Sequence, residues 1–187
     1  MTLNLDIFNL VHSLAGRWGI LDRVGIFFAE YAVYLVILVF LFFFVFGFQL
    51  SRERATFFAQ SVLAFTISFG VILGVAHEFF YLARPFVELG FAPLVYGQQS
   101  SAFPSGHAMA VFMLSALIFS RHRKLGIALF LVSAIIGVAR VFAGVHWPLD
   151  IIGGAVFGAG SAFFSYKLIY GTKQKSVDSA VISKTEK

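Results

Sequence analysis

Long apolar segments that are almost free of charge limit the fold of this sequence more than any other feature. The first runs from Val24 to Leu50 and contains one charged residue, Glu30. At about 1.5 Å per residue, a helix of this length is about 40 Å long and crosses the hydrocarbon core of a bilayer with some tilt. The whole chain is 59% hydrophobic and 12% charged, whereas soluble domains are about 45–50% and about 25%. We therefore expect an all-α membrane protein.

Four further apolar segments predict a polytopic helical bundle with about five transmembrane helices. The second segment, Ala55 to Ala83, stops before Pro85, which cannot continue a helix. The remaining three cover about residues 105–119, 125–141 and 148–170. Small residues let membrane helices approach closely, and the last segment contains four glycines: Gly153, Gly154, Gly158 and Gly160.

A shorter amphipathic helix is predicted at the N-terminus, over residues 3–14. It is too short to span a membrane, and we expect it to lie in the interface. Asp6, Asn9 and Ser13 share one helical face. The opposite face is apolar and comprises Leu3, Ile7, Leu10, Val11 and Leu14.

The distribution of basic residues predicts the topology and explains the net charge of +5 without a nucleic-acid partner. Ten of the fourteen basic residues lie in the first loop, the third loop or the C-terminal end, so the positive-inside rule makes that side cytoplasmic. We expect a single membrane domain over residues 1–172 and a polar, frayed cytoplasmic tail over 173–187. Because no basic segment with a small-residue cleavage site opens the chain, we expect no cleaved signal peptide.

Three groups of polar residues are predicted to meet on the outer side of the membrane. They lie at the ends of different helices and comprise Arg84, then Ser105, Gly106 and His107, and then Arg140, His146 and Asp150. Ionisable residues in a membrane are costly to leave unpaired, which makes a functional site the default interpretation. A polar cluster that only joins helix ends is the alternative, and the convergence of three groups disfavours it.

These residue types suit a phosphate. Two arginines can hold phosphoryl oxygens through paired hydrogen bonds and keep their charge. Ser105 and Gly106 lie at a predicted helix N-terminus, where free N–H groups favour an anion. His146 and Asp150 are four residues apart, so the carboxylate can hold one ring nitrogen and leave the other as a nucleophile. His107 then remains as a proton donor to the leaving oxygen.

At these positions the chain resembles the type 2 phosphatidic acid phosphatase (PAP2) superfamily. The family signature is Lys-x6-Arg-Pro, then Pro-Ser-Gly-His, then Ser-Arg-x5-His-x3-Asp. The sequence matches it in the same order with Arg84-Pro85, Pro104-Ser105-Gly106-His107 and Arg140-x5-His146-x3-Asp150.

The resemblance implies a helical bundle that hydrolyses a phosphate ester or diphosphate without a metal or other cofactor. His146 would take the phosphoryl group as phosphohistidine, Asp150 would orient His146, and His107 would act as the general acid. The remaining motif residues would bind the transferred phosphate: Arg84, Ser105, Gly106 and Arg140.

Two positions depart from the signature. Ala139 stands where the third motif has serine, which removes one hydrogen bond, and His77 stands where the first motif has lysine. His77 lies seven residues before Arg84, hence on the same helical face and about 10 Å away along the axis. It either has a reduced or water-mediated role at the phosphate or pairs with Glu30 or Glu78. We treat His77 and Glu30 as accessory residues of the predicted site.

Beyond the motifs, a softer similarity covers most of the chain. Leu5-Asp6-Ile7-Phe8, Phe28-Ala29-Glu30-Tyr31 and Arg84-Pro85-Phe86 look like bacterial undecaprenyl pyrophosphate phosphatases of the bacitracin-resistance type. This resemblance implies cell-wall lipid recycling at the outer face of a bacterial cytoplasmic membrane. Phosphatidylglycerophosphate, phosphatidic acid and a lipid A phosphate remain alternative substrates.

A small channel or transporter is the alternative from another class of protein. Intramembrane charges also mark ion paths, but transporters place them near the midplane and often have repeated halves. The polar residues of this chain instead cluster at one level of helix ends, and no internal repeat is present. The sequence does not determine the oligomeric state.

Overall fold

The computed structural model describes residues 2–79, 81–96 and 100–185, with side chains placed between residues 3 and 171 in those ranges. Gly97, Gln98 and Gln99 of the predicted polar loop lie outside the described residues. All regular elements in the described part of the chain are helices, which confirms the predicted all-α class. In chain order they are α1 (Thr2–His12), α2 (Gly19–Ile26), the π-helix η1 (Phe27–Tyr31), α3 (Ala32–Phe46), α4 (Ser51–Phe65), the π-helix η2 (Thr66–Leu73), α5 (Gly74–Phe79), α6 (Pro85–Leu89), α7 (Gly106–Phe119), α8 (Arg123–Phe142) and α9 (Pro148–Thr185).

Four helical segments are long and apolar enough to cross a membrane: Gly19–Phe46, Ser51–Phe79, Arg123–Phe142 and Pro148–Gly171. They correspond to the first, second, fourth and fifth predicted spans. The predicted ends of the first two were wrong by several residues. Gly47 caps the first helix before Leu50, and the second ends at Phe79, so Leu82 and Ala83 lie outside any helix. Hydropathy locates apolar residues, whereas these ends depend on local caps.

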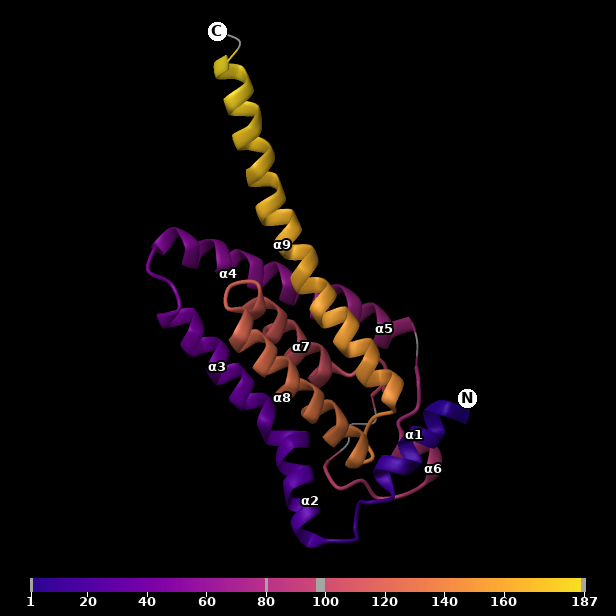
Figure 1. Cartoon of the computed structure of the whole chain (residues 1–187). Helices are drawn as coiled ribbons and strands as arrows, with labels where there is room; N and C mark the ends of the chain where they lie inside the picture. Colours follow the sequence, from indigo (N-terminus) through magenta and orange to yellow (C-terminus); the bar gives the residue numbers. More distant parts are fainter. Residues whose placement is uncertain (1, 80, 97–99, 186–187) are drawn as a thin grey trace.

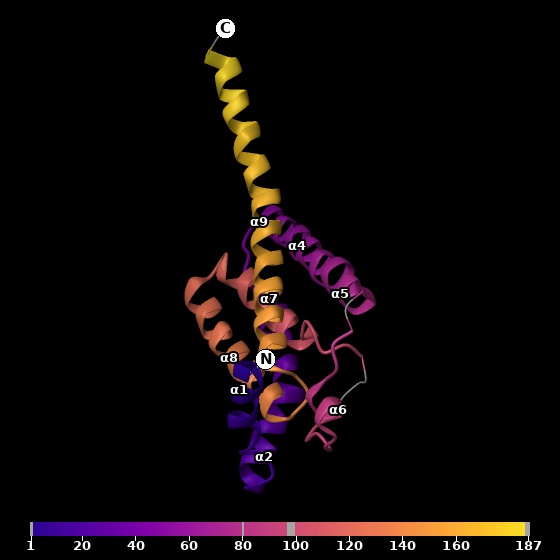
Figure 2. The same cartoon turned by 90° about the vertical axis from the view of Figure 1, so that its right-hand side faces the viewer.

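The third predicted span is a short central helix. α7 has 14 residues, about 21 Å at the helical rise, which is less than the hydrocarbon thickness. It packs against α3, α4, α8 and α9, and both views place it in the middle of the bundle (Figures 1 and 2). Its buried side chains include Met109, Val111 and Met113. Because other helices shield α7 from lipid, its length need not match the bilayer.

Glycines set the distance between α7 and α9. A Cβ atom built on Gly154 would lie 2.6 Å from the carbonyl oxygen of Ser105, and one on Gly158 would lie 2.2 Å from that of Met109. Only hydrogen atoms fit at these two positions, so the predicted close approach of helices is confirmed there. Gly160 has no such neighbour within 4 Å, and the prediction was wrong for this residue.

The N-terminal helix α1 lies against the beginning of α9 (Figure 1). Phe8 is 1% exposed, with its ring 5.0 Å from that of Trp147, and His12 Nδ1 is 2.9 Å from the carbonyl oxygen of Phe142. The face that packs on the protein is therefore the one carrying Phe8 and His12. Leu3 and Leu10 of the predicted apolar face point outward, 72% and 73% exposed, as expected for a helix that meets lipid.

Two further elements differ from the sequence prediction. The polar loop after the second span contains the short helix α6, which begins with Pro85 in its first turn and ends at Gly90 with a φ of 70°. Helix α9 continues to Thr185 (Figure 1), although the tail from Gly171 was predicted to be frayed. No proline follows Gly171, so nothing in the backbone interrupts the helical hydrogen bonds.

Candidate active site

Arg84 is positioned by extended chain between α5 and α6, and not by the end of a helix as predicted. It is the N-cap of α6, with φ −75° and ψ 154°, because the residue before a proline avoids helical angles. Its side chain is 7% exposed. The extended backbone therefore carries a guanidinium inward from the edge of the bundle.

The Arg84 guanidinium is held by neighbouring loops. Nε donates to the carbonyl oxygen of Ser100 at 3.1 Å, and Nη2 lies 3.2 Å from the Ser100 hydroxyl. Nη1 donates to the carbonyl oxygen of Val145 at 3.3 Å and to Nε2 of His146 at 3.2 Å. Burial lowers the pKa of Arg84. The predicted phosphate contact would thus replace hydrogen bonds that the protein already makes.

His146 and Asp150 form the pair predicted from their spacing. Nδ1 of His146 is 3.3 Å from Oδ2 of Asp150, and the same oxygen accepts the backbone N–H of Trp147 at 2.8 Å. Nδ1 therefore donates its proton to the carboxylate, and Nε2 carries a lone pair. Burial lowers the pKa of His146 well below its usual range, and the positive charges of Arg140 and Arg84 lower it further. A neutral imidazole with its lone pair on Nε2 is the form required of a nucleophile, and in this structure that lone pair accepts the hydrogen bond from Nη1 of Arg84.

The second motif joins this pair through the backbone at the start of α7. Ser105 is the N-cap residue, and its hydroxyl accepts the N–H of Ala108 at 3.4 Å. Its own N–H donates to the carbonyl oxygen of Asp150 at 3.0 Å, which fixes the helix N-terminus beside the third motif. A Cβ atom on Gly106 would lie 3.8 Å from the side chain of Leu73, an ordinary van der Waals contact. The protein itself therefore leaves room above Gly106.

Arg140 is the second buried guanidinium, 5% exposed. Its Nη1 donates to the carbonyl oxygen of Ala29 at 3.1 Å, inside the π-helix η1, and Glu30 lies within electrostatic reach. Its Nε is buried without a hydrogen-bond partner in the described residues. His107 lies within electrostatic reach of Arg140 and of His146. A buried donor without an acceptor costs about 1–3 kcal/mol, so Arg140 is suited to receive an anion.

The accessory residues have separate surroundings. His77 lies within electrostatic reach of Arg84 and interacts with the backbone of Pro104, while its Nε2 is buried without a partner in the described part of the chain. Glu30 is near Arg140 instead. Ala139 packs in an apolar cluster with Val145, so its methyl group occupies space that the usual serine would fill.

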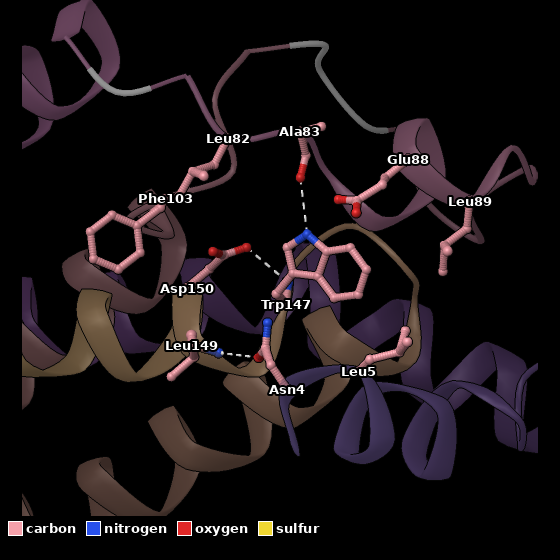
Figure 3. A pocket seen from close by; sticks show the side chains of 10 residues that line it. All are labelled: Asn4, Leu5, Leu82, Ala83, Glu88, Leu89, Phe103, Trp147, Leu149 and Asp150. Carbon is pink, nitrogen blue, oxygen red and sulfur yellow. Dashed lines mark hydrogen bonds between the residues drawn. The ribbon is translucent and has the colours of Figure 1, made fainter. Parts of the chain in front are cut away.

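A cavity of about 400 Å³ borders the site on the side of α1. Figure 3 shows Trp147 in its middle, with Nε1 donating to the carbonyl oxygen of Ala83 at 2.9 Å. The backbone N–H of Leu149 donates to Oδ1 of Asn4 at 3.1 Å (Figure 3). The lining residues are Asn4, Leu5, Leu82, Ala83, Glu88, Leu89, Phe103, Trp147, Leu149 and Asp150.

Sequence reasoning missed three contributors to the site. Trp147 joins the third motif to Ala83, Ser100 holds the Arg84 guanidinium, and the carbonyl of Ala29 accepts from Arg140. Trp147 could have been predicted to lie at the site from its position in the sequence, between His146 and Pro148. The other two contacts involve backbone carbonyl groups, which cannot be predicted from the residue type. Within the described residues, no three His, Asp or Glu side chains are grouped as metal ligands.

Comparison with known proteins finds relatives that match most of the chain. The chain is 30% identical over 167 residues to the "Bacitracin transport permease protein BcrC" of Bacillus licheniformis, covering 88% of this chain and 79% of that protein. It is 28% identical over 167 residues to the "Undecaprenyl-diphosphatase BcrC" of Bacillus subtilis, covering 88% and 84%. The crystal structure of LpxE from Aquifex aeolicus superposes with a TM-score of 0.72 at 28% identity, over 88% of this chain and 95% of LpxE.

The family assignment rests on a longer match than the three motifs. The sequence pattern of the PAP2 superfamily matches residues 59–174, which contain every predicted catalytic and phosphate-binding residue. The helical architecture and the apolar spans agree with a multi-pass membrane protein of this kind. This chain therefore belongs to the PAP2 superfamily and is a membrane phosphatase.

Proposed function

We propose that this protein hydrolyses undecaprenyl pyrophosphate to undecaprenyl phosphate. The observation that carries the proposal is the state of His146, whose Nε2 lone pair is preserved by Asp150 on one side and faces Arg84 on the other. A buried imidazole that contacts the Arg84 guanidinium and lies within electrostatic reach of Arg140 is suited to attack a phosphoryl group. The resemblance to undecaprenyl-diphosphatase BcrC supports the choice of substrate.

The reaction has two displacement steps. Nε2 of His146 attacks the terminal phosphorus, the bond to the bridging oxygen breaks, and His107 donates a proton to that oxygen, so the lipid monophosphate leaves. Water then gives a proton to His107 and attacks the phosphorus of phosphohistidine, the P–N bond breaks and inorganic phosphate is released. Arg140 and the N–H groups at the start of α7 stabilise the charge on the transferred phosphoryl group. No step requires a metal ion.

The outer loop supports a pyrophosphate substrate over one with a large anionic head group. Residues 88–103 contain no Lys or Arg, so this loop provides no cation for the remote phosphates of a lipid A. A pyrophosphate needs only the two arginines and the helix N-terminus. A phosphatidylglycerophosphatase is the second candidate, supported by "Phosphatidylglycerophosphatase B" of Bacillus subtilis, 38% identical over 83 residues.

The distribution of charge supports a site at the outer face of a bacterial cytoplasmic membrane. Arg121, between α7 and α8, and Arg123 and Lys124, in the first turn of α8, lie at the opposite end of these helices from His107 and Arg140. The positive-inside rule places that end in the cytoplasm. An impermeant thiol reagent should therefore label a cysteine at Tyr96 in intact cells but not one at Arg123. The reverse labelling pattern would show that the protein has the opposite orientation in the membrane.

A transporter is less compatible with the site, although the name of one relative contains the word permease. The ionisable residues lie at helix ends, at the start of α7 and α9 and the end of α8. A transport path would instead need them near the bilayer midplane. The His146 and Asp150 pair also has a chemical role that transport does not require.

Phosphate release in detergent tests the proposed function directly. Undecaprenyl pyrophosphate, phosphatidylglycerophosphate, phosphatidic acid and a lipid A phosphate are compared in one detergent, at equal surface concentrations and with EDTA present. We expect the highest kcat/KM for the prenyl pyrophosphate and no turnover by His146→Ala. A preference for phosphatidylglycerophosphate would assign the second candidate, and full activity of His146→Ala would exclude the phosphohistidine mechanism.

A further inference from the structure

The cavity beside α1 is built from the nearest neighbours of the catalytic motifs. One lining residue comes from each motif or its flank: Ala83 beside Arg84, Phe103 two residues before Ser105, and Trp147 beside His146. Asp150 belongs to both the site and the cavity wall (Figure 3). The cavity therefore adjoins the place where the phosphate is proposed to bind.

The cavity walls carry charge of only one sign. Glu88 and Asp150 are the two ionisable residues among the lining side chains, and both are acids. The other lining residues are mainly apolar and include Leu5 on α1, Leu82 and Phe103 (Figure 3). Carboxylates disfavour a phosphate, whereas leucine and aromatic side chains favour a hydrocarbon.

An apolar surface continues from the cavity along α9. Leu149 lines the cavity and is 56% exposed, and Ile152 and Val156 follow at 56% and 62%. Their spacing of three and four residues places them on one face of the helix. This face begins at the level of His146 and runs toward the other end of the bundle, so a chain leaving the cavity along it would pass into the bilayer.

We propose that the cavity binds the first part of the substrate's hydrocarbon tail, which then continues along Leu149, Ile152 and Val156 of α9. The inference rests on the proposed function and adds the position of the leaving group. The lipid monophosphate stays between the two arginines and the cavity mouth, and the acidic cavity excludes the phosphates. α1 forms the outer wall, where Asn4 is tied to α9 through the N–H of Leu149.

Narrowing the cavity tests this inference. Leu149→Trp keeps the backbone N–H that Asn4 accepts and puts a larger side chain at the cavity wall. Leu131→Trp is the matched control, since Leu131 is 64% exposed on α8 and does not line the cavity. The kcat/KM values are measured for a long-chain prenyl pyrophosphate and for a water-soluble pyrophosphate with a single prenyl unit.

We expect Leu149→Trp to lower the long-to-short ratio of kcat/KM by about tenfold, the usual effect of a changed fit in an apolar pocket. Leu131→Trp should leave the ratio unchanged. If Leu149→Trp lowers both values equally, or resembles Leu131→Trp, the tail does not occupy the cavity. A parent protein that hydrolyses neither pyrophosphate would instead contradict the proposed function.

A binding measurement tests the cavity without turnover. The chain has two tryptophans, so Trp18→Phe leaves the fluorescence of Trp147 alone. A prenyl monophosphate with a spin label near its phosphate should quench Trp147, and an unlabelled long-chain prenyl monophosphate should restore the signal. Trp147→Phe reports Trp18 as the control, which the competitor should not affect. A Trp147 signal that the competitor does not restore would overturn the inference.

Discussion

Gly158→Ala should disturb both stability and catalysis, because Gly158 sets the distance between α9 and α7. The new methyl group would lie 2.2 Å from the carbonyl oxygen of Met109 and 3.0 Å from its carbonyl carbon. Ordinary contact requires about 3.5 Å, so the two backbones must separate by about 1 Å. Overpacking of this kind costs about 1–3 kcal/mol.

The same movement would reach the site. The N–H of Ser105 donates to the carbonyl oxygen of Asp150 at 3.0 Å, and this bond joins the start of α7 to the start of α9. A displacement of about 1 Å at a catalytic group can lower the rate about a hundredfold. We therefore expect Gly158→Ala to lower kcat/KM as well as the unfolding temperature.

Gly160→Ala is the matched control on the same helix. No atom outside the helix lies within 4 Å of a Cβ at Gly160, and alanine is a better helix former than glycine by about 1 kcal/mol. Thermal unfolding in detergent and phosphate release are measured for both variants and the parent. If Gly158→Ala is as stable and as active as Gly160→Ala, the glycine contact does not position the two motifs.

Three further predictions concern the site itself. His146→Ala should abolish release of phosphate, whereas His107→Ala should slow it by about a hundredfold or more and still form phosphoenzyme from a substrate with a good leaving group, as measured by acid-quenched labelling. Gly106→Ala should lower kcat/KM, because the added methyl group would occupy the space where the phosphate is proposed to bind. The unfolding temperature should not change, because the Cβ meets only Leu73, at 3.8 Å. The pKa of His146 is lowered from 6.5 in the folded protein, so His146 should stay neutral at pH 6.5 and kcat/KM should not fall there through its protonation. Below pH 6.5 the free energy of unfolding should decrease, since only the unfolded state readily takes up the proton. A loss of kcat/KM with an apparent pKa of 6.5 assigned to His146 would contradict this.

The residues of the site were predictable because membranes restrict polar side chains. Arg84, His107 and Arg140 stood out against apolar surroundings, and the spacing of His146 and Asp150 fixed their pairing before any contact was known. The side of the bundle on which they meet followed from the number of helices between them. These arguments need only the period of a helix and the cost of an unpaired charge.

The hydrogen-bond partners were not predictable in the same way. The sequence suggested two arginines free to hold a phosphate, but the guanidinium of Arg84 donates to the carbonyl oxygens of Ser100 and Val145. Arg140 donates to Ala29, whose π-helix has no recognisable pattern in an apolar stretch. Backbone carbonyls are present at every residue, so only the tertiary fold determines which of them face a buried cation.

These carbonyl contacts explain how the site keeps two arginines buried without a substrate. Removing a charge from water costs several kcal/mol unless other dipoles replace the water. Each nitrogen of the Arg84 guanidinium donates to a backbone carbonyl oxygen, whereas Arg140 keeps a buried Nε without an acceptor in the described residues. In the proposed mechanism, an incoming phosphate would meet an unsatisfied donor at Arg140, and at Arg84 it would compete with carbonyl oxygens and with Nε2 of His146. If the phosphate takes over the Arg84 hydrogen bond to His146, the lone pair of Nε2 becomes free to attack, so in the proposed mechanism binding of the charged group would also release the nucleophile.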